Sequence, residues 1–297
     1  MLAAELHGKI SDRNISDRME DVLTSYVMSL FRYLNNLYIP LLFLSQARNL
    51  HGEFLHIGKT LSAVELFFWP KFSLNDKSSR EPDALLVFSE NLSNCDIAIE
   101  IEAKYLSGLS NIYTPEFDED MDEDKGELEF LKYGHQLADE YCGLYCGNWN
   151  LETDTQKRLS LSERKYLVFI TGHYELPRQD LLDAVYEVEQ RKCYNTEINC
   201  GLNPGENIFW VSWRQLSEIL ETESLAGYPD YSQGEINLLE DIRNMLIGRG
   251  LVPFTVWQNL QPVMVYKSFW ERKAGIDGGY WAGLEVVSGY IPFLKKF

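Results

Sequence analysis

Apolar residues recur at helical spacing near the start of the chain. In the segment SDRMEDVLTSYVMSLFRYL, which begins at Ser16, the periodic apolar positions are Met19, Leu23, Tyr26, Val27, Leu30 and Leu34. Spacings of three and four residues are typical of one face of an α-helix, and serine is a common N-cap. We therefore predict an amphipathic helix with Ser16 as its N-cap.

Three segments with the pattern of β-strands follow this helix. They cover residues 61–69, 83–88 and 95–105 and are rich in β-branched and aromatic residues. Short polar segments separate them, and consecutive strands joined by short turns usually pair. The pattern therefore predicts an antiparallel meander.

The remaining pattern alternates helices and strands. It predicts a helix from Leu128 to Tyr145 that ends at Gly147, and a helix over 180–191. The segment 165–173 is almost wholly apolar, as expected of a central strand covered on both faces. A further strand over 207–212 and a short helix through Leu220 complete the predicted order αβββαβαβα. This order predicts an α/β (α+β) fold with a mixed sheet flanked by helices.

The last part of the chain has a weaker pattern. It contains one predicted helix near residues 235–247, and then an aromatic-rich stretch whose structure the pattern does not predict. We therefore divide the chain into a domain over residues 1–222 and a helical and aromatic extension over 223–297 that packs on the core.

Composition fits an ordinary globular protein. The chain has 297 residues, 45% of them hydrophobic, and its longest apolar stretch, residues 38–44, is far shorter than the roughly 20 residues that cross a bilayer. We see no secretory signal at the N-terminus and expect a cytoplasmic location. The five cysteines are more typical of buried thiols than of a zinc site or a disulfide framework.

The net charge of −18 argues against a nucleic-acid partner, because such proteins usually neutralise phosphates with Lys and Arg. Part of the acidity lies in one segment, residues 116–129, which we expect to be a solvated loop. A local basic groove is enough for binding, so the charge weakens this interpretation without excluding it.

Candidate chemistry lies in the second and third predicted strands. In the third strand, isoleucines alternate with Glu100, Glu102 and Lys104, and the period of two places these charges on one face. Asp83 opens the neighbouring strand directly after Pro82, which a strand tolerates at its first residue. Phosphodiester hydrolysis near neutral pH needs a divalent metal and a cation near the attacked phosphate, and two carboxylates and a lysine can meet that need.

This pattern resembles the signature of the PD-(D/E)XK nuclease superfamily. Pro82 and Asp83 are followed, after 18 residues, by Glu102, Ala103 and Lys104. Many members also carry a glutamate on the helix before the sheet, which Glu20 matches, and a glutamine on the helix after the third strand, which Gln136 matches.

The resemblance covers about residues 16–172. It implies a restriction-endonuclease-like fold and a nuclease that depends on Mg²⁺, for which Mn²⁺ can substitute. The implied substrate is nucleic acid, with DNA expected before RNA. It is also associated with restriction, repair and defence, among which no residue distinguishes.

The resemblance suggests a role for each site residue, as a hypothesis. Asp83, Glu102 and the Ala103 carbonyl would bind the metal, and Glu20 would hold it through water or bind a second ion. Lys104 would orient the nucleophile, and Gln136 would position Lys104 or the phosphate. We expect Glu100, about 7 Å further along the strand, to lie outside the first ligand sphere.

Three alternatives remain open. The chain could be an inactive nuclease-fold subunit that serves as a binding or assembly module. It could also reach nucleic acid only through a protein partner, with the loop at 116–129 shielding the groove. Aromatic residues near the C-terminus could stack on bases. Packing in a core is the more expected role for these residues, which are Trp257, Phe269, Trp270, Tyr280 and Trp281.

Overall fold

A five-stranded mixed sheet forms the centre of the computed structural model, which describes residues 15–57, 61–74, 78–90, 96–105, 135–162, 164–194, 203–222 and 231–253. The strand order is β1-β4-β5-β7-β8. The strands span β1 (Leu61–Phe68), β4 (Ala84–Glu90), β5 (Asp96–Ala103), β7 (Arg164–Thr171) and β8 (Ile208–Ser212). The first three pair antiparallel and the last three parallel. The predicted meander and mixed sheet are confirmed, and β7 lies inside the sheet, between β5 and β8, as its apolar pattern predicts.

A small antiparallel sheet accompanies the large one. Its strands are β2 (Phe72–Leu74), β3 (Ser78–Arg80) and β6 (Asn148–Trp149), in the order β3-β2-β6. The β2–β3 hairpin interrupts the meander between β1 and β4, and the sequence pattern did not predict it.

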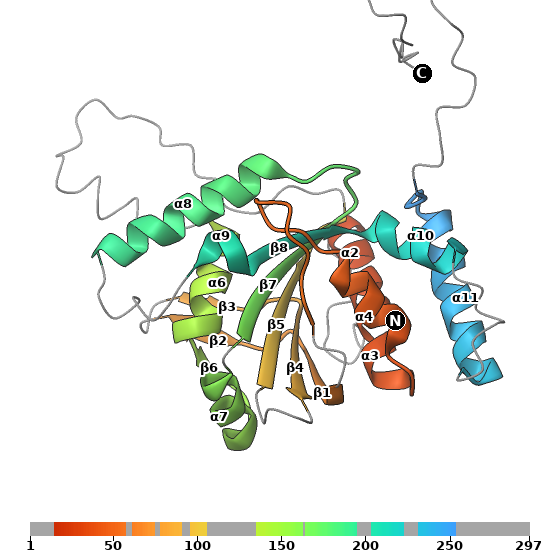
Figure 1. Ribbon diagram of the computed structural model, residues 1–297, viewed down its shortest axis with the longest axis horizontal. Coiled ribbons are helices and arrows are strands. Elements are labelled where there is room, and N and C mark those ends of the chain that lie inside the picture. The colour runs from red at the N-terminus through yellow and green to blue at the C-terminus, as the bar shows by residue number, and fades with distance from the viewer. Residues whose placement is uncertain are drawn as a thin grey trace, which may run out of the picture. The chain divides into compact units, whose positions relative to one another are not determined.

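Helices cover both faces of the large sheet (Figure 1). One layer contains α2 (Ile15–Met28), α3 (Leu30–Tyr33), α4 (Tyr38–Ser45), α10 (Trp213–Thr222) and α11 (Gln233–Gly248). The opposite layer contains α6 (Gln136–Cys146), α7 (Thr153–Leu161), α8 (Arg178–Tyr194) and α9 (Pro204–Asn207). None of the helices in these described segments has the length and hydrophobicity that crossing a membrane requires.

The alternation of side chains along the strands assigns each residue to one of these layers. Ile97, Ile99 and Ile101 of β5 face the α2 layer, where they join the largest hydrophobic core. Ala98 faces the α6 layer instead. Because the period of a strand is two, Glu100 and Glu102 also project toward α6. Glu100 and Glu102 therefore both lie on the face of the sheet that α6 covers.

The first predicted helix differs from the observed one in two respects. The helix already includes Ile15, so Ser16 lies inside it and is not its N-cap. The pattern through Leu34 is also split at Ser29, between α2 and α3. The Ser29 hydroxyl donates to the Ser25 carbonyl at 2.5 Å, a side-chain bond that commonly bends helices.

Other predictions are confirmed in part. Gly147 ends α6 as expected, but α6 begins at Gln136, and residues 128–134 of the predicted helix lie outside the described residues. Cys142 is buried as expected, whereas Cys146 is exposed because it lies on the outer side of the last turn of α6. The acidic segment 116–129 and the C-terminal aromatic residues also lie outside the described residues, so the hypotheses about them stay predictions.

The predicted helix near 235–247 is confirmed as α11. Ser232 and Glu235 form a reciprocal capping box at its start. Its residues Leu239, Ile242 and Leu246 join the same hydrophobic core as the sheet. The described residues all lie in one compact unit, which ends at Pro253. The division at residue 222 stays a prediction.

Gly143 allows α6 to approach the small sheet, which generates a stability prediction. A Cβ atom at Gly143 would overlap the Phe72 ring, so Gly143→Ala should destabilise the fold by about 1–3 kcal/mol despite the better helix propensity of alanine. Chemical denaturation measures this change. The matched control is Gly234→Ala in the first turn of α11, where nothing lies within 4 Å of the added Cβ, and it should be neutral or stabilising. Equal effects of the two substitutions would contradict the packing argument.

Candidate functional site at the end of strands β4 and β5

Asp83 and Glu102 meet at one end of the antiparallel β4–β5 pair. Ala84 lies opposite Ile101, so the next step of the register brings Asp83 opposite Glu102. Both side chains are buried and project toward the α6 layer. Directly opposed residues of an antiparallel pair have Cβ atoms about 4.5–5.5 Å apart, so the two carboxyl groups are close neighbours.

Backbone bonds fix this strand end. The Asp83 carboxylate accepts a hydrogen bond from the Ala103 backbone N–H at 2.8 Å. The Lys104 N–H donates to the Ile170 carbonyl at 2.7 Å, which extends the pairing of β5 and β7 by one residue. The backbone around Lys104 is therefore held on both sides, by the Asp83 carboxylate on the β4 side and by the Ile170 carbonyl on the β7 side.

The Lys104 ammonium bridges two carboxylates. Its Nζ lies 2.7 Å from Oε1 of Glu102 and 3.1 Å from Oε1 of Glu20. The other oxygen of Glu20 accepts from the Tyr105 N–H at 2.9 Å. Glu20 comes from α2 on the opposite face of the sheet from α6, so it reaches Lys104 around the strand end.

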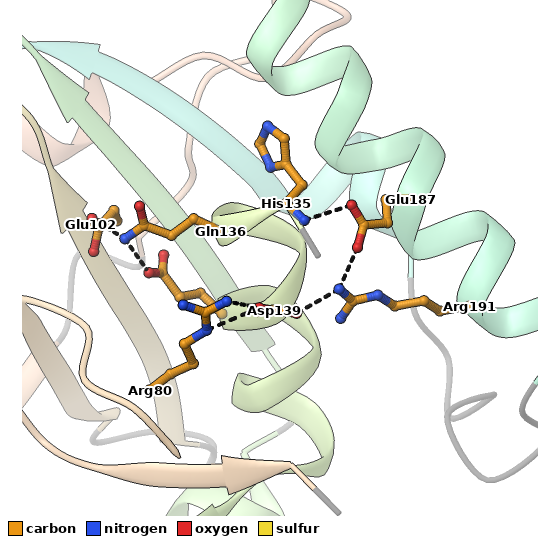
Figure 2. Close-up of polar contacts among 8 residues, drawn as sticks. Arg80, Glu102, His135, Gln136, Asp139, Glu187 and Arg191 are labelled. Carbon is orange, nitrogen blue, oxygen red and sulfur yellow. Dashed lines mark hydrogen bonds and ion pairs between the residues drawn. The ribbon is translucent and has the colours of Figure 1, made fainter. Parts of the chain in front are cut away.

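Gln136 approaches from the α6 side. Its Nε2 donates to Oε1 of Glu102 at 2.5 Å and to Oε1 of Glu140 at 2.9 Å (Figure 2). These contacts orient Glu102, whereas the sequence suggested Lys104 or the phosphate as the partner of Gln136. All five predicted site residues thus meet at this strand end: Glu20, Asp83, Glu102, Lys104 and Gln136.

Two further carboxylates lie at this site: Glu140, which the sequence pattern did not predict, and Glu100, which was expected outside the first ligand sphere. Glu140 lies one turn after Gln136 on α6, and both residues point at the sheet. Both oxygens of Glu100 and Oε2 of Glu140 are buried without a hydrogen-bond partner. The signal for Glu140 was its spacing of four residues from Gln136, which places both on one helix face.

Burial makes this group of carboxylates hard to ionise. The pKa of Asp83 is raised well above its usual value by desolvation and then by the charge of Glu102. Desolvation also raises the pKa of Glu102, with Glu140 as the next cause. The pKa of Glu100 is raised by desolvation and Glu102, and that of Glu140 is raised to about 8 by desolvation and Glu100.

Lys104 responds in the opposite sense. Desolvation alone would lower the pKa of its ammonium, but Glu102, Glu20 and Asp83 outweigh that effect and raise it. Lys104 is therefore charged at neutral pH and offsets part of the surrounding negative charge.

The carboxylates suit a divalent cation in chemistry and in charge. Hard oxygen donors are the ligands that Mg²⁺ prefers, and buried carboxyl oxygens without partners gain most from a counter-ion. Within the described segments, however, no three His, Cys, Asp or Glu side chains stand as a ready metal-binding group. The Lys104 ammonium bonds to two of the candidate ligands, so a cation would share them with it.

A second polar network holds α6 in place on its other side (Figure 2). Asp139 of α6 accepts from Nε of Arg80 in β3 at 2.9 Å and from Arg191 of α8 at 2.5 Å. Arg191 also pairs with Glu187, which accepts from the His135 N–H at 2.7 Å. These contacts tie the start of α6 to α8 and to the β2–β3 hairpin, and so fix where Gln136 and Glu140 point.

Comparison of the chain with protein-family models, with curated proteins and with solved structures finds no match in any of the three.

The raised pKa of Glu140 predicts a pH-dependent stability. The folded protein binds this proton more tightly than the unfolded chain, so the stability it contributes is present below pH 4.5 and is lost as the pH rises toward about 8. Glu140→Gln should reduce the fall in unfolding free energy over this window by up to about 1.4 kcal/mol per pH unit. Denaturant unfolding across the pH range measures it. Glu218→Gln on the exposed side of α10 is the control, and an unchanged pH profile in Glu140→Gln would contradict the prediction.

The network around Asp139 gives a prediction about helix placement. Asp139→Asn removes the charge that two arginines share, so it should destabilise the protein by about 1.5–3 kcal/mol. Thermal and chemical denaturation measure this loss. Asp183→Asn on the exposed face of α8 should stay within about 0.5 kcal/mol of the parent protein. A loss no larger at Asp139 than at Asp183 would show that the network does not stabilise α6.

Proposed function

We propose that this protein is a metal-dependent nuclease that hydrolyses phosphodiester bonds of DNA or RNA. The observation that supports this most strongly is the convergence of Asp83, Glu102 and Lys104 at one buried strand end. Isolated charges are costly to bury, so a protein without a use for them would be expected to place them elsewhere.

The topology agrees with this proposal. A restriction-endonuclease-like domain combines an antiparallel meander with parallel strands in one mixed sheet between helices, and β1-β4-β5-β7-β8 has that arrangement. The two helices expected to contribute Glu20 and Gln136 lie on opposite faces of the sheet. The proposed fold family rests on this arrangement together with the residue pattern.

The resemblance and the observed contacts together suggest a role for each group. Asp83, Glu102 and the Ala103 carbonyl would hold the Mg²⁺ or Mn²⁺ ion. When bound, such an ion neutralises charge on the phosphate and lowers the pKa of a water molecule. Lys104 would orient the attacking water, and Glu20 would keep the ammonium in place through their ion pair. Gln136 would orient the Glu102 carboxylate.

An inactive nuclease-fold subunit is the second candidate, and one observation favours it. Lys104 is engaged by both Glu20 and Glu102, and the described residues contain no ready group of three metal ligands. A protein of this kind would keep the charge network for stability and use its surface for binding or assembly.

Activity measurements on matched variants test the proposal. Purified protein is incubated with single- and double-stranded DNA and with RNA, in Mg²⁺ or Mn²⁺ and in EDTA. We expect metal-dependent cleavage that Asp83→Asn and Lys104→Gln each reduce at least about 100-fold in kcat, because each removes a group that acts on the reacting atoms. Asp154→Asn and Lys157→Gln, two exposed residues of α7, are the charge-matched controls.

A metal titration separates the two candidates. In a nuclease, Mg²⁺ or Mn²⁺ should raise the melting temperature of the parent protein, and Asp83→Asn should abolish that rise. An inactive subunit shows neither cleavage nor a metal-dependent rise. Cleavage that both site variants leave unchanged would remove the site assignment altogether.

A further inference from the structure

A cavity of about 470 Å³ lies at the outer edge of β1. Its walls are Arg32 of α3, residues 66–71 at the end of β1, and residues 150–151 after β6. The Asn150 N–H donates to the Lys71 carbonyl at 2.8 Å, which ties the second and third walls together. β1 is an edge strand of the large sheet, so this hollow wraps around the sheet margin.

The walls combine aromatic surface with two cations. The Phe68 and Trp69 rings, with centroids 5.4 Å apart, are each only 5% exposed and belong to the core behind the cavity, so the partly exposed Phe67 is the aromatic wall that a ligand can reach. The Arg32 guanidinium lies 5.7 Å from the Phe68 centroid. Arg32 also donates to the Leu66 carbonyl at 3.0 Å, which holds the cation beside the cavity.

Lys71 is the second cation and is available to a ligand. Its side chain is 61% exposed and pairs with Glu81 at 3.2 Å. An exposed pair of this kind contributes little to stability, so the ammonium can exchange Glu81 for a phosphate at little cost.

The backbone at Trp69 connects this cavity to the candidate site. Trp69 has φ 46°, a left-handed conformation that is costly for a residue with a bulky side chain. Its N–H still donates to the Asp83 carbonyl at 3.1 Å. The Asp83 carboxylate in turn accepts from Ala103. Trp69 of the cavity wall thus neighbours the candidate ligand Asp83 on the next strand, and Glu102 lies one strand further on, with neighbouring strands about 4.8 Å apart.

We propose that this cavity binds one unpaired nucleotide of the substrate strand, next to the phosphate that is cut. The base would pack on the aromatic wall, and its phosphate would pair with Lys71 and Arg32. Base stacking on aromatic side chains together with backbone neutralisation is the general mode of single-strand binding. The volume lies near the lower end of the ~300–1,000 Å³ of small-ligand sites, so it suits one nucleotide and not a duplex. This inference rests on the proposed function, because it specifies the substrate of that site as single-stranded.

The binding experiment is carried out in EDTA, so that it does not depend on cleavage. Fluorescence anisotropy compares labelled oligothymidylate, the same oligonucleotide annealed to its complement, and competition by free thymidine monophosphate. Lys71→Ala should weaken single-strand binding several-fold and lower the salt slope by about 1, the loss of one phosphate contact. Phe67→Ala, which removes an aromatic wall, should weaken it at least about fivefold. Lys157→Ala, an exposed lysine on α7, is the matched control and should change neither quantity.

A second readout uses the cleavage reaction. In the presence of Mg²⁺, Lys71→Ala should raise KM with little change in kcat, since this residue binds the substrate and does not touch the reacting phosphate. In the binding experiment, competition by thymidine monophosphate supports a subsite for one nucleotide, whereas its failure to compete even in large excess overturns that subsite.

The outcomes distinguish the two proposals. Single-strand binding that Lys71→Ala and Phe67→Ala leave unchanged, or tighter binding of the duplex, overturns the nucleotide subsite and leaves the nuclease proposal intact. Absence of cleavage in the parent protein, with single-strand binding that still depends on Lys71, overturns the nuclease proposal and leaves the cavity only as a site that binds single strands.

Discussion

The buried negative charge on one face of β5 is the constraint on which the site depends. Glu100 and Glu102 project from this strand toward α6, where Glu140 faces them, and Asp83 lies across from Glu102. Carboxylates in such a position must be protonated, paired or bound to a cation. Lys104 supplies part of that compensation by bonding to Glu102 and Glu20. The same ammonium is therefore a structural counter-ion and the candidate catalytic cation.

The orientation of α6 is the second determinant of the geometry of the candidate site, and residues outside the site set this orientation. Asp139 is held by Arg80 and Arg191, while Gly143 lets the helix lie against Phe72. With the helix fixed at both points, Gln136 is directed at Glu102. The geometry of the candidate site thus depends on a hairpin and a helix that contribute no group to it.

Much of the sheet and the site could be predicted because their patterns are local. The alternation of isoleucines with Glu100, Glu102 and Lys104 fixes the face of each residue, and the structure has the same alternation. The elements that were missed carry weak patterns: β2 and β3 have three residues each, and α7 buries only Thr155 and Leu159. Helix α4 is apolar throughout and contains Pro40, so it shows no helical period. The contact of Gln136 with Glu102 depends on how α6 packs, which no local pattern encodes.

The approach of Glu20 from one layer and of Gln136 from the other has a consequence for synthesis of the chain. No fragment shorter than residues 20–136 contains the whole set, and the set assembles only after both layers have closed on the sheet. A chain that is still being synthesised on the ribosome can therefore contain some of these residues before they are brought together. The proposed nuclease site would therefore be complete only when folding is nearly finished, and proteolytic removal of α2 would take Glu20 away from Lys104.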